Sequence, residues 1–252
     1  MFQMNQQSER GGYHQSNAAS DAGLRAYMLG VYNYMAGGVF LTGAVAYATF
    51  AAAIVQSSDI GRIGLSEFGH VLYESPVKWA VMLAPLAIVF FLSSQANTLS
   101  VGAAQGGFWL FSAAMGMSLS SIFLVYTGAS IAQMLFVTSA AFGALSLYGY
   151  TTRTSLSSLG TFLLMGLFGL VMAALLNIWL QSSALKFAVS AIGVLVFAGL
   201  TAYDTQRIKD GYFEVSGDIA ATSKAAVLGA LSLYLDFINM FTMLLSLFGE
   251  RK

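Results

Sequence analysis

The sequence is poor in charged residues. Only 9% of its 252 residues are Asp, Glu, Lys or Arg, whereas about a quarter of the residues in an ordinary soluble domain are charged. So few charges cannot cover the surface of a soluble globule of this size, and the mean hydropathy of +0.72 leads to the same conclusion. The formal net charge is zero, so we expect no basic face for nucleic acid.

Residue types that hold metals or form covalent intermediates are scarce as well. There is no cysteine, which excludes disulfides, thiolate metal sites and cysteine nucleophiles. The two histidines, His14 and His70, lie outside the apolar segments. A histidine metal site inside a membrane is therefore not expected, and neither is a resident cofactor.

Apolar residues, in contrast, make up 57% of the chain, and they gather in seven long runs. Each run is near the roughly 20 residues that a helix needs to cross the hydrocarbon core of a bilayer. Helices are the expected form there, because the backbone has no water to bond. The runs are approximately 27–55, 76 or 77–94, 107–126, 130–150, 159–180, 185–203 and 225–248. The sequence predicts an all-α membrane protein, a seven-transmembrane helix bundle that has the lipid bilayer as a partner.

A single transmembrane domain is expected over residues 25–252, because no linker in it is long enough to separate two domains. The longest polar connections are 56–75 and 204–224. Residues 1–24 are rich in Gln, Ser, Asn and Gly, a composition that predicts a disordered N-terminal tail. In the third run Ser112, Gly116 and Ser120 recur every four residues, a spacing that permits close helix approach. Chance explains that spacing about as well in a chain with 26 glycines.

The basic residues do not orient the bundle. With seven spans and the N-terminus inside, six Lys and Arg residues lie on inner segments and five on outer ones, which decides nothing under the positive-inside rule. A re-entrant last segment that leaves both termini inside changes the count to eight against three. The length and unbroken apolarity of 225–248 favour a full span instead.

Two acidic residues stand apart from the other nine, which lie in the tails, in the connections or at their edges. Asp204 ends the sixth run in LTAYDTQRIK, and Asp236 lies deep in the seventh in LSLYLDFINMF. A charged Asp at the bilayer centre costs about 3 kcal/mol on insertion scales, and such residues usually face the bundle interior and mark an ion or proton pathway. The alternatives are a structural Asp236 bonded to a neighbouring helix and an interfacial ion pair between Asp204 and Arg207.

The neighbours of Asp236 favour an interior position. Small or polar residues recur at spacings of three and four along one stripe of the last helix, and such a stripe faces protein or water rather than lipid. The members of the stripe are Gly229, Ser232, Asp236, Asn239, Met243 and Ser246. Leu231, Leu235 and Phe241 are expected on other faces.

The two aspartates are expected to act as a pair. The sixth and seventh helices are joined by one loop, which predicts antiparallel neighbours. Two carboxylates in contact do not both ionise cheaply and tend to share a proton, and a deprotonated pair is an oxygen-rich site for a hard cation such as calcium. Because Asp204 lies near the predicted interface and Asp236 deeper, contact requires a tilted helix or a water-filled vestibule.

AGLTAYDTQRIK (198–209) and LSLYLDFINMFTMLLSLFG (231–249) closely resemble the Bax inhibitor family of membrane proteins. ALSLYGYTTRTSLS (144–157) resembles that family's connection between the fourth and fifth helices. The resemblance covers roughly 24–249, and the version here is similar to the bacterial, inner-membrane members. It implies seven helices with the last one central and surrounded by the other six, and an N-terminus inside.

The resemblance also implies a function. The family is associated with pH-dependent calcium leak, and its two-aspartate sensor matches Asp204 and Asp236. The expected ligands are therefore calcium ions or protons, with Ser232 and Asn239 beside the pair. Some members carry a basic residue at the inner end of the second helix that interacts with the pair, but FFLSSQANTLS (90–100) has none. Either the gating differs here, or the role passes to one of three residues, namely Arg153, Arg207 and Lys209.

Two other functions stay open. Some bacterial relatives are thought to modulate a membrane protease, so a non-transporting regulator of other membrane proteins is one alternative. An intramembrane aspartyl protease also places two aspartates on consecutive helices, and its dyad shares a proton. Such proteases resemble one another in a Gly-x-Gly-Asp motif around the second aspartate, but residues 233–236 here are LYLD. They also share a Pro-Ala-Leu motif after it, whereas both prolines here, Pro76 and Pro85, lie far upstream. We therefore expect no enzyme.

Overall fold

The computed structural model describes the backbone of residues 2–56, 63–96 and 98–252, and the side chains of 21–55, 64–96 and 98–252. Seven helices in the described residues are long and apolar enough to cross a membrane. They are α1 (Phe2–Ala53), α3 (Val77–Ser94), α4 (Val101–Leu119), α6 (Gly128–Thr151), α7 (Ser157–Leu180), α8 (Ser183–Val215) and α9 (Ile219–Phe248). The short α5 (Ile122–Val125) continues the span that begins with α4. The prediction of an all-α protein with seven spanning helices is confirmed.

The connection between α1 and α3 holds the remaining elements. Strands β1 (Ile54–Gln56) and β2 (Ile63–Leu65) pair antiparallel, with Val55 opposite Gly64. Helix α2 (Glu67–Tyr73) follows, and the Ser66 side chain caps its first turn. The sequence predicted only a polar connection here, because elements this short show too little periodicity to be recognised.

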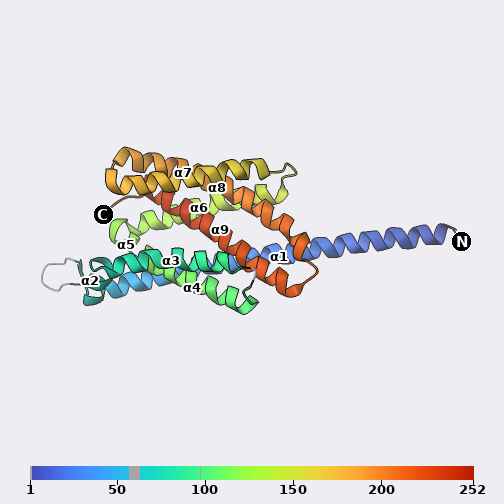
Figure 1. The fold of residues 1–252 in the computed structure, drawn as a ribbon, viewed down its shortest axis with the longest axis horizontal. Helices are drawn as coiled ribbons and strands as arrows, with labels where there is room; N and C mark the ends of the chain where they lie inside the picture. The colour runs from blue at the N-terminus through green and yellow to red at the C-terminus, as the bar shows by residue number, and fades with distance from the viewer. Residues whose placement is uncertain (1, 57–62, 97) are drawn as a thin grey trace.

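The last helix is central, as predicted. Figure 1 shows α9 running diagonally between α6, α7 and α8 on one side and α1, α3 and α4 on the other. Helix α9 packs against α1, α4, α6 and α8, and 56% of its most apolar stretch is buried, more than in any other spanning helix that the structure describes. The implied ring of six differs in one respect. Helix α3 packs mainly on α4, and α7 on α8, so these two form an outer layer.

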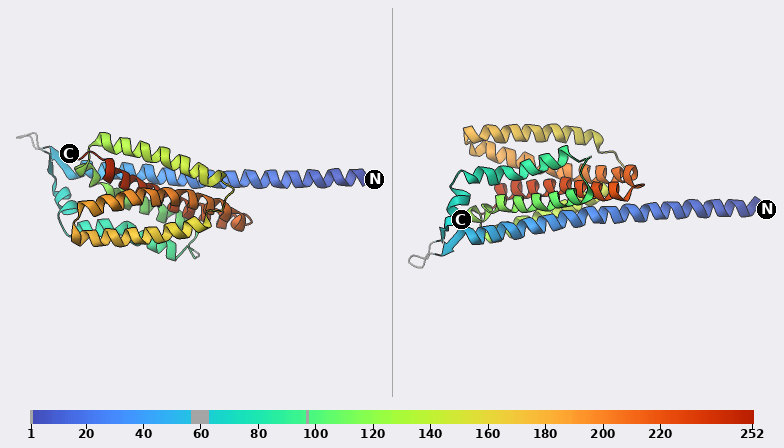
Figure 2. Two further views of the ribbon diagram at one scale, coloured as in Figure 1. Left: turned by 90° about the horizontal axis from the view of Figure 1, so that it is seen from above. Right: turned by 60° about the horizontal axis from the view of Figure 1, so that its bottom comes forward.

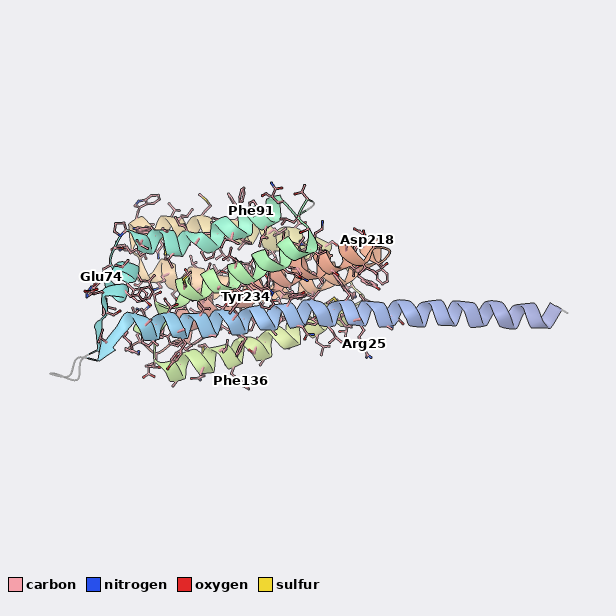
Figure 3. The ribbon with its side chains drawn as sticks, turned by 90° about the horizontal axis from the view of Figure 1, so that it is seen from below. Arg25, Glu74, Phe91, Phe136, Asp218 and Tyr234 are labelled. Atoms are coloured by element: carbon pink, nitrogen blue, oxygen red, sulfur yellow. The ribbon has the colours of Figure 1, made fainter. Side chains whose placement is uncertain are left out.

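Tyr234 connects the middle of α9 to α1 and α4. Its side chain is fully buried, and its hydroxyl lies 2.6 Å from the Thr42 hydroxyl of α1. Its ring meets Phe111 of α4 edge-on, with 5.2 Å between the ring centroids. Figure 3 shows Tyr234 behind α1, inside the bundle. A polar aromatic residue is held here because its ring fills the core while its hydroxyl finds a partner.

Small residues bring α4 and α1 together. Ser112 and Ser120 are fully buried, and a Cβ atom on Gly116 would lie 2.7 Å from the carbonyl oxygen of Thr42. No side chain larger than hydrogen fits at that distance. The stripe of small residues in α4 therefore marks a close helix contact and not a chance spacing.

Helix α8 is longer than its apolar run. The run ends at 203, but the helix continues to Val215, and α9 begins at Ile219. The Asp218 carboxylate caps α9 by accepting hydrogen bonds from the amides of Ala220 and Ala221. The connection predicted at 204–224 is thus a helical hairpin with a three-residue turn. The charged residues beyond 203 end the apolar pattern without ending the helix, since Gln, Arg and Lys are good helix formers.

The predicted disordered tail, residues 1–24, lies mostly outside the described side chains. The structure has α1 helical from Phe2, and the described side chains begin at Asp21. The last residues of the predicted tail are ordered. Leu24 packs against the core, and the ring centroid of the next aromatic residue, Tyr27, lies 5.2 Å from that of Tyr212. Contacts with α8 hold residues 21–24 in place, and for the residues before them the disordered tail stays a prediction.

The structure predicts that the two termini lie on opposite sides of the membrane. Figure 3 shows Arg25 and Asp218 toward one end of the bundle and Glu74 at the other. The C-terminus lies at the Glu74 end (Figure 2), and α9 is one continuous helix rather than a re-entrant hairpin. We expect reporter tags on the two ends to give opposite accessibility in intact cells. Equal accessibility at both ends would contradict the seven-span bundle.

Candidate functional site

The candidate site lies on the antiparallel hairpin of α8 and α9. The Ser190 hydroxyl donates to Ser246 over 3.1 Å, and Cβ atoms on Gly193 and Gly229 would meet Met243 and Ile208. This register places Asp236 level with the turn of α8 around residue 200. Asp204 is one helical turn away, roughly 5–6 Å along the axis. The sequence predicted that Asp204 lies near the interface and Asp236 deeper. In the structure the difference in depth is small, because Asp204 lies inside α8 and not at its end.

Both aspartates line one cavity of about 360 Å³ between α7, α8 and α9. Helix α8 contributes Asp204 and Arg207, and α9 contributes Ser232, Asp236 and Asn239. Most of the remaining wall consists of apolar side chains from α7 and α8. The Asp204 side chain is 13% exposed, and Asp236 is 4% exposed. The two carboxylates therefore face the same space, as the predicted vestibule requires.

One carboxylate oxygen of Asp236 has no hydrogen-bond partner. Its Oδ2 atom is buried and unpartnered in the part of the chain that the structure describes. The nearby polar groups bond to their own helix instead: the Asn239 amide donates to the carbonyl of Leu235, and the Ser232 hydroxyl to that of Leu228. A buried acceptor without a partner is costly. The structural role considered for Asp236, a bond to a neighbouring helix, is not found at this oxygen.

Arg207 is the basic residue beside the pair. Its guanidinium lies 3.5 Å from the Asp204 carboxylate, one turn along the same helix, and the Arg207 side chain is 57% exposed. It also lies over the ring of Tyr203, at 6.0 Å from the centroid. Arg207 therefore stands between Asp204 and the outside of the bundle. With the guanidinium more than half exposed to its surroundings, this ion pair contributes little to stability.

The other two basic candidates lie elsewhere. The Lys209 ammonium donates to the carbonyl of Tyr150 at the end of α6 over 3.0 Å and lies 4.0 Å from Asp210. Arg153 is exposed in the connection between α6 and α7. Neither residue lines the cavity. Of the three candidates, only Arg207 is placed to interact with the aspartates.

The polar stripe of α9 faces α8 and the cavity, as its spacing predicted. Ser232, Asp236, Asn239 and Met243 line the cavity, Gly229 lies against Ile208, and Ser246 bonds to Ser190. The prediction for Leu235 was wrong, since it lines the same cavity. A helical stripe is wide enough to include a residue beside its axis.

The residues that follow Asp204 connect the site to other helices, which the sequence did not reveal. The Thr205 hydroxyl lies 3.0 Å from that of Ser146 in α6, which in turn lies 2.7 Å from the Tyr32 hydroxyl in α1. The Gln206 amide accepts from the Leu156 amide over 2.7 Å and donates to the carbonyl of Thr154 over 3.0 Å. Consecutive helical residues point in different directions, so the four residues Asp204 to Arg207 reach the cavity, α6, the α6–α7 connection and the surface.

Most of the chain is similar in sequence to known proteins. Residues 24–252 match the family model described as "Inhibitor of apoptosis-promoting Bax1". The chain belongs to the Bax inhibitor family. Inner membrane protein YbhL of Escherichia coli strain K12 is 47% identical over 233 residues, which cover 92% of this chain and 94% of that protein. An uncharacterized protein of Caulobacter vibrioides is 44% identical over 232 residues, with 92% and 91% covered, and one of Rickettsia prowazekii is 42% identical over 236 residues, with 94% of each covered.

In this Bax inhibitor family protein, the cavity offers few ligands to a metal ion. The described residues contain no group of three or more His, Cys, Asp or Glu side chains that could hold one. Calcium takes about six to eight oxygen ligands, and the cavity supplies two carboxylates, one amide and one hydroxyl. This donor set fits a transient contact with a partly hydrated cation better than a tight binding site.

Proposed function

We propose that this chain is a pH-sensitive calcium-leak channel of the bacterial inner membrane, in which Asp204 and Asp236 share a proton that controls cation passage. The observation that carries the proposal is the single cavity that both aspartates line, with one oxygen of Asp236 unpartnered. Acidic residues in the interior of a membrane bundle usually mark an ion or proton route. The inner-membrane location is supported by the name of the relative in Escherichia coli.

Polar residues continue from the cavity toward both ends of the bundle. On one side the half-exposed Arg207 reaches the surface. On the other, the stripe of α9 ends at Ser246, which lines a second cavity of about 320 Å³ together with Asn177, Lys186 and Arg251. A cation that followed this seam would meet the side-chain oxygen atoms of the aspartate cavity first and that of Ser246 after them.

Met243 separates the two cavities. Its side chain lies beside Gly193, where a Cβ atom would be 3.2 Å from the Met243 sulfur. Methionine has three rotatable bonds and adapts readily to changes around it. In the proposed mechanism Met243 is the apolar barrier of the closed state, and a change in the charge of the aspartate pair shifts α9 against α8 enough to move it aside.

Calcium flux across liposome membranes tests the proposal. The purified protein is reconstituted into vesicles that contain a calcium-sensitive dye, and influx is followed over a series of pH values with protein-free vesicles as the control. We expect a protein-dependent flux that changes with pH. No flux at any pH would overturn the channel, and the non-transporting regulator of other membrane proteins would then be the better function.

The aspartyl protease alternative lacks support from the sequence around Asp236. Residues 233–236 are LYLD, without the glycines that let a substrate backbone approach the second aspartate of such enzymes. We expect the purified protein to leave a transmembrane peptide uncut. Cleavage that disappears with either aspartate would place the protease ahead of the channel.

A further inference from the structure

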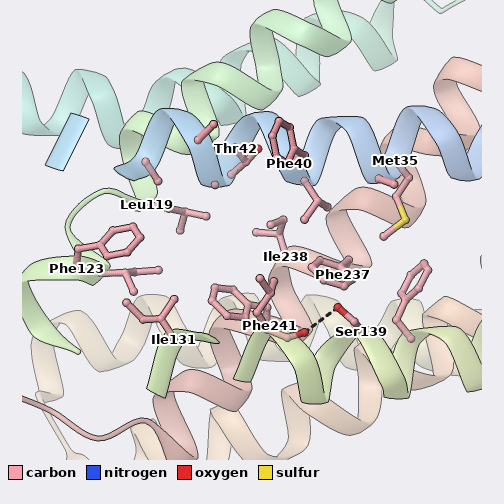
Figure 4. A pocket seen from close by; sticks show the side chains of 18 residues that line it. Met35, Phe40, Thr42, Leu119, Phe123, Ile131, Ser139, Phe237, Ile238 and Phe241 are labelled. Carbon is pink, nitrogen blue, oxygen red and sulfur yellow. Dashed lines mark hydrogen bonds between the residues drawn. The ribbon is translucent and has the colours of Figure 1, made fainter. Parts of the chain in front are cut away.

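A lateral groove separates α1 from α6. Both helices pack against α8 and α9, but within the described residues they make no extensive contact with each other. The space between them forms a cavity of about 630 Å³ with α9 behind it. Figure 4 shows Met35 and Phe40 of α1 above this space, Ile131 of α6 below it, and Phe237 and Phe241 of α9 at the back.

The groove continues toward the Arg25 end of the bundle. A second cavity of about 460 Å³ lies between the same two helices, and Phe142 lines both cavities. Each volume is in the range of ligand pockets, about 300–1,000 Å³. Along α1 the lining extends from Arg25 to Ala46, which is roughly 32 Å of helix. That length matches a whole hydrocarbon core of about 30 Å, so a lipid from one leaflet would occupy the half of the groove nearer Arg25.

The wall of the groove is apolar and opens to the side. Phe40 is 79% exposed and Phe136, on the outer face of α6, is 76% exposed, so the surface around the opening faces lipid when the protein is in a bilayer. Water is not favoured between apolar walls, and an empty space forfeits dispersion contacts. Hydrocarbon is the occupant that the surroundings supply.

The Arg25 end of the groove is polar. Arg25, Tyr32, Ser146 and Tyr150 line the second cavity, and the hydroxyls of Tyr32 and Ser146 lie 2.7 Å apart. Arg25 is exposed, and no ion pair or hydrogen bond joins its side chain to another described residue. A guanidinium without a partner at the mouth of an apolar groove complements a phosphate group.

We propose that the groove between α1 and α6 binds one anionic phospholipid from the leaflet on the Arg25 side. Its phosphate lies against Arg25, and one acyl chain runs past Phe142 toward Phe40. A chain of methylene groups can pass Phe142, whereas an α-helix with its side chains is about 10–12 Å across. The lipid site does not depend on the proposed channel function.

Photo-crosslinking from the edge of the groove tests this site. The chain has no cysteine, so a benzophenone probe can be attached to a single cysteine made by Phe40→Cys. The matched control is Phe168→Cys, at a residue of α7 that is 70% exposed and lines none of the groove. In vesicles of mostly phosphatidylcholine with a minority of phosphatidylglycerol, mass spectrometry identifies the captured molecule. We expect phosphatidylglycerol to be enriched about fivefold over its bulk share at position 40, the weight of one basic residue near an anionic surface, and not at position 168.

Two further variants assign the parts of the site, both in the Phe40→Cys protein. Arg25→Gln should abolish the enrichment, whereas Lys78→Gln, at the other end of the bundle, should not. Gly143→Leu should reduce all lipid capture, because a Cβ at Gly143 meets no atom within 4 Å and a larger side chain would enter the groove. Gly169→Leu is its control, since Gly169 is equally open but lies on α7.

Two results would overturn the lipid site. Capture of both lipids in their bulk ratio at position 40, unchanged by Arg25→Gln, would mean ordinary boundary lipid. Crosslinks from position 40 to another protein, or to a second copy of this chain, would mean that a helix and not a lipid covers the groove. A thermal unfolding scan of each variant separates loss of the site from loss of the fold.

Discussion

Replacing either cavity aspartate by asparagine should remove the pH dependence of calcium flux while leaving the protein folded. Asn keeps the shape of Asp and its hydrogen bonding, but it cannot ionise. If Asp204 and Asp236 share one proton across the cavity, the proton belongs to the pair and not to either residue. Either substitution therefore removes the switch, and the ratio of flux between acidic and neutral pH should fall to about one.

The double variant and a matched control sharpen this test. Residues that act as one unit are not additive, so Asp204→Asn with Asp236→Asn should resemble either single variant rather than their sum. Asp210→Asn is the control, because Asp210 lies on the same helix with a side chain that is 65% exposed and lines no part of the cavity. Its pH profile should equal that of the native protein.

Native pH profiles in both cavity variants would refute the sensor. The switch would then have to lie elsewhere, although the native flux would still support a channel. Arg207→Gln gives a further distinction. It removes the charge beside Asp204 without removing a carboxylate, so it should displace the pH profile along the axis but not flatten it. A flat profile in Arg207→Gln would make the guanidinium part of the switch itself.

Most of the architecture follows from the sequence, because the bilayer imposes simple rules. A span must be long and apolar, and its backbone must be helical. These rules located seven helices but not their true ends. Helix α8 runs twelve residues past its apolar run, from 203 to 215, since a helix leaves the membrane without changing its backbone. Local hydropathy indicates whether a segment lies in lipid or in water. It does not indicate where a helix begins or ends, because that depends on capping, as at Asp218.

The candidate site was partly predictable for a similar reason. Asp236 stands out because a carboxylate inside an apolar run is rare, and its spacing from Ser232 and Asn239 indicates the face that it occupies. Thr205 and Gln206 do not stand out in this way, because they lie among other polar residues after the sixth apolar run. Their partners, Ser146 and Leu156, are separated from them by 59 and 50 positions in the chain. Only the packing of α6 and α7 against α8 brings them together.

Glycine shows the same limit most clearly. The chain has 26 glycines, and outside the small-residue stripes of α4 and α9 nothing in the sequence distinguishes those in close contacts from those on open surfaces. Gly143 and Gly149 illustrate both kinds on α6. A Cβ at Gly143 would meet no atom within 4 Å, whereas one at Gly149 would collide with the backbone carbonyl of Ala202 in α8.

Gly149→Ala should therefore destabilise the protein, and Gly143→Ala should not. The added methyl group at 149 meets a backbone carbonyl that has no rotamer to escape into, so α6 and α8 must move apart. Overpacking of this kind costs about 1–3 kcal/mol, and the thermal midpoint of the purified protein should fall accordingly. At 143 the same change meets open space, and the higher helix propensity of Ala leaves the midpoint equal or higher.

The contact between Gly149 and Ala202 lies two residues from Asp204, so the damage should extend to the candidate site. Separation of α6 from α8 also stretches the bond between Ser146 and Thr205, which is 3.0 Å in the native protein. We expect Gly149→Ala to lose pH-dependent flux together with stability, whereas Asp236→Asn loses pH dependence alone. If Gly149→Ala were as stable as Gly143→Ala, α6 and α8 would not cross as closely as the structure has them. The inference that α6 holds Asp204 in position would then be wrong as well.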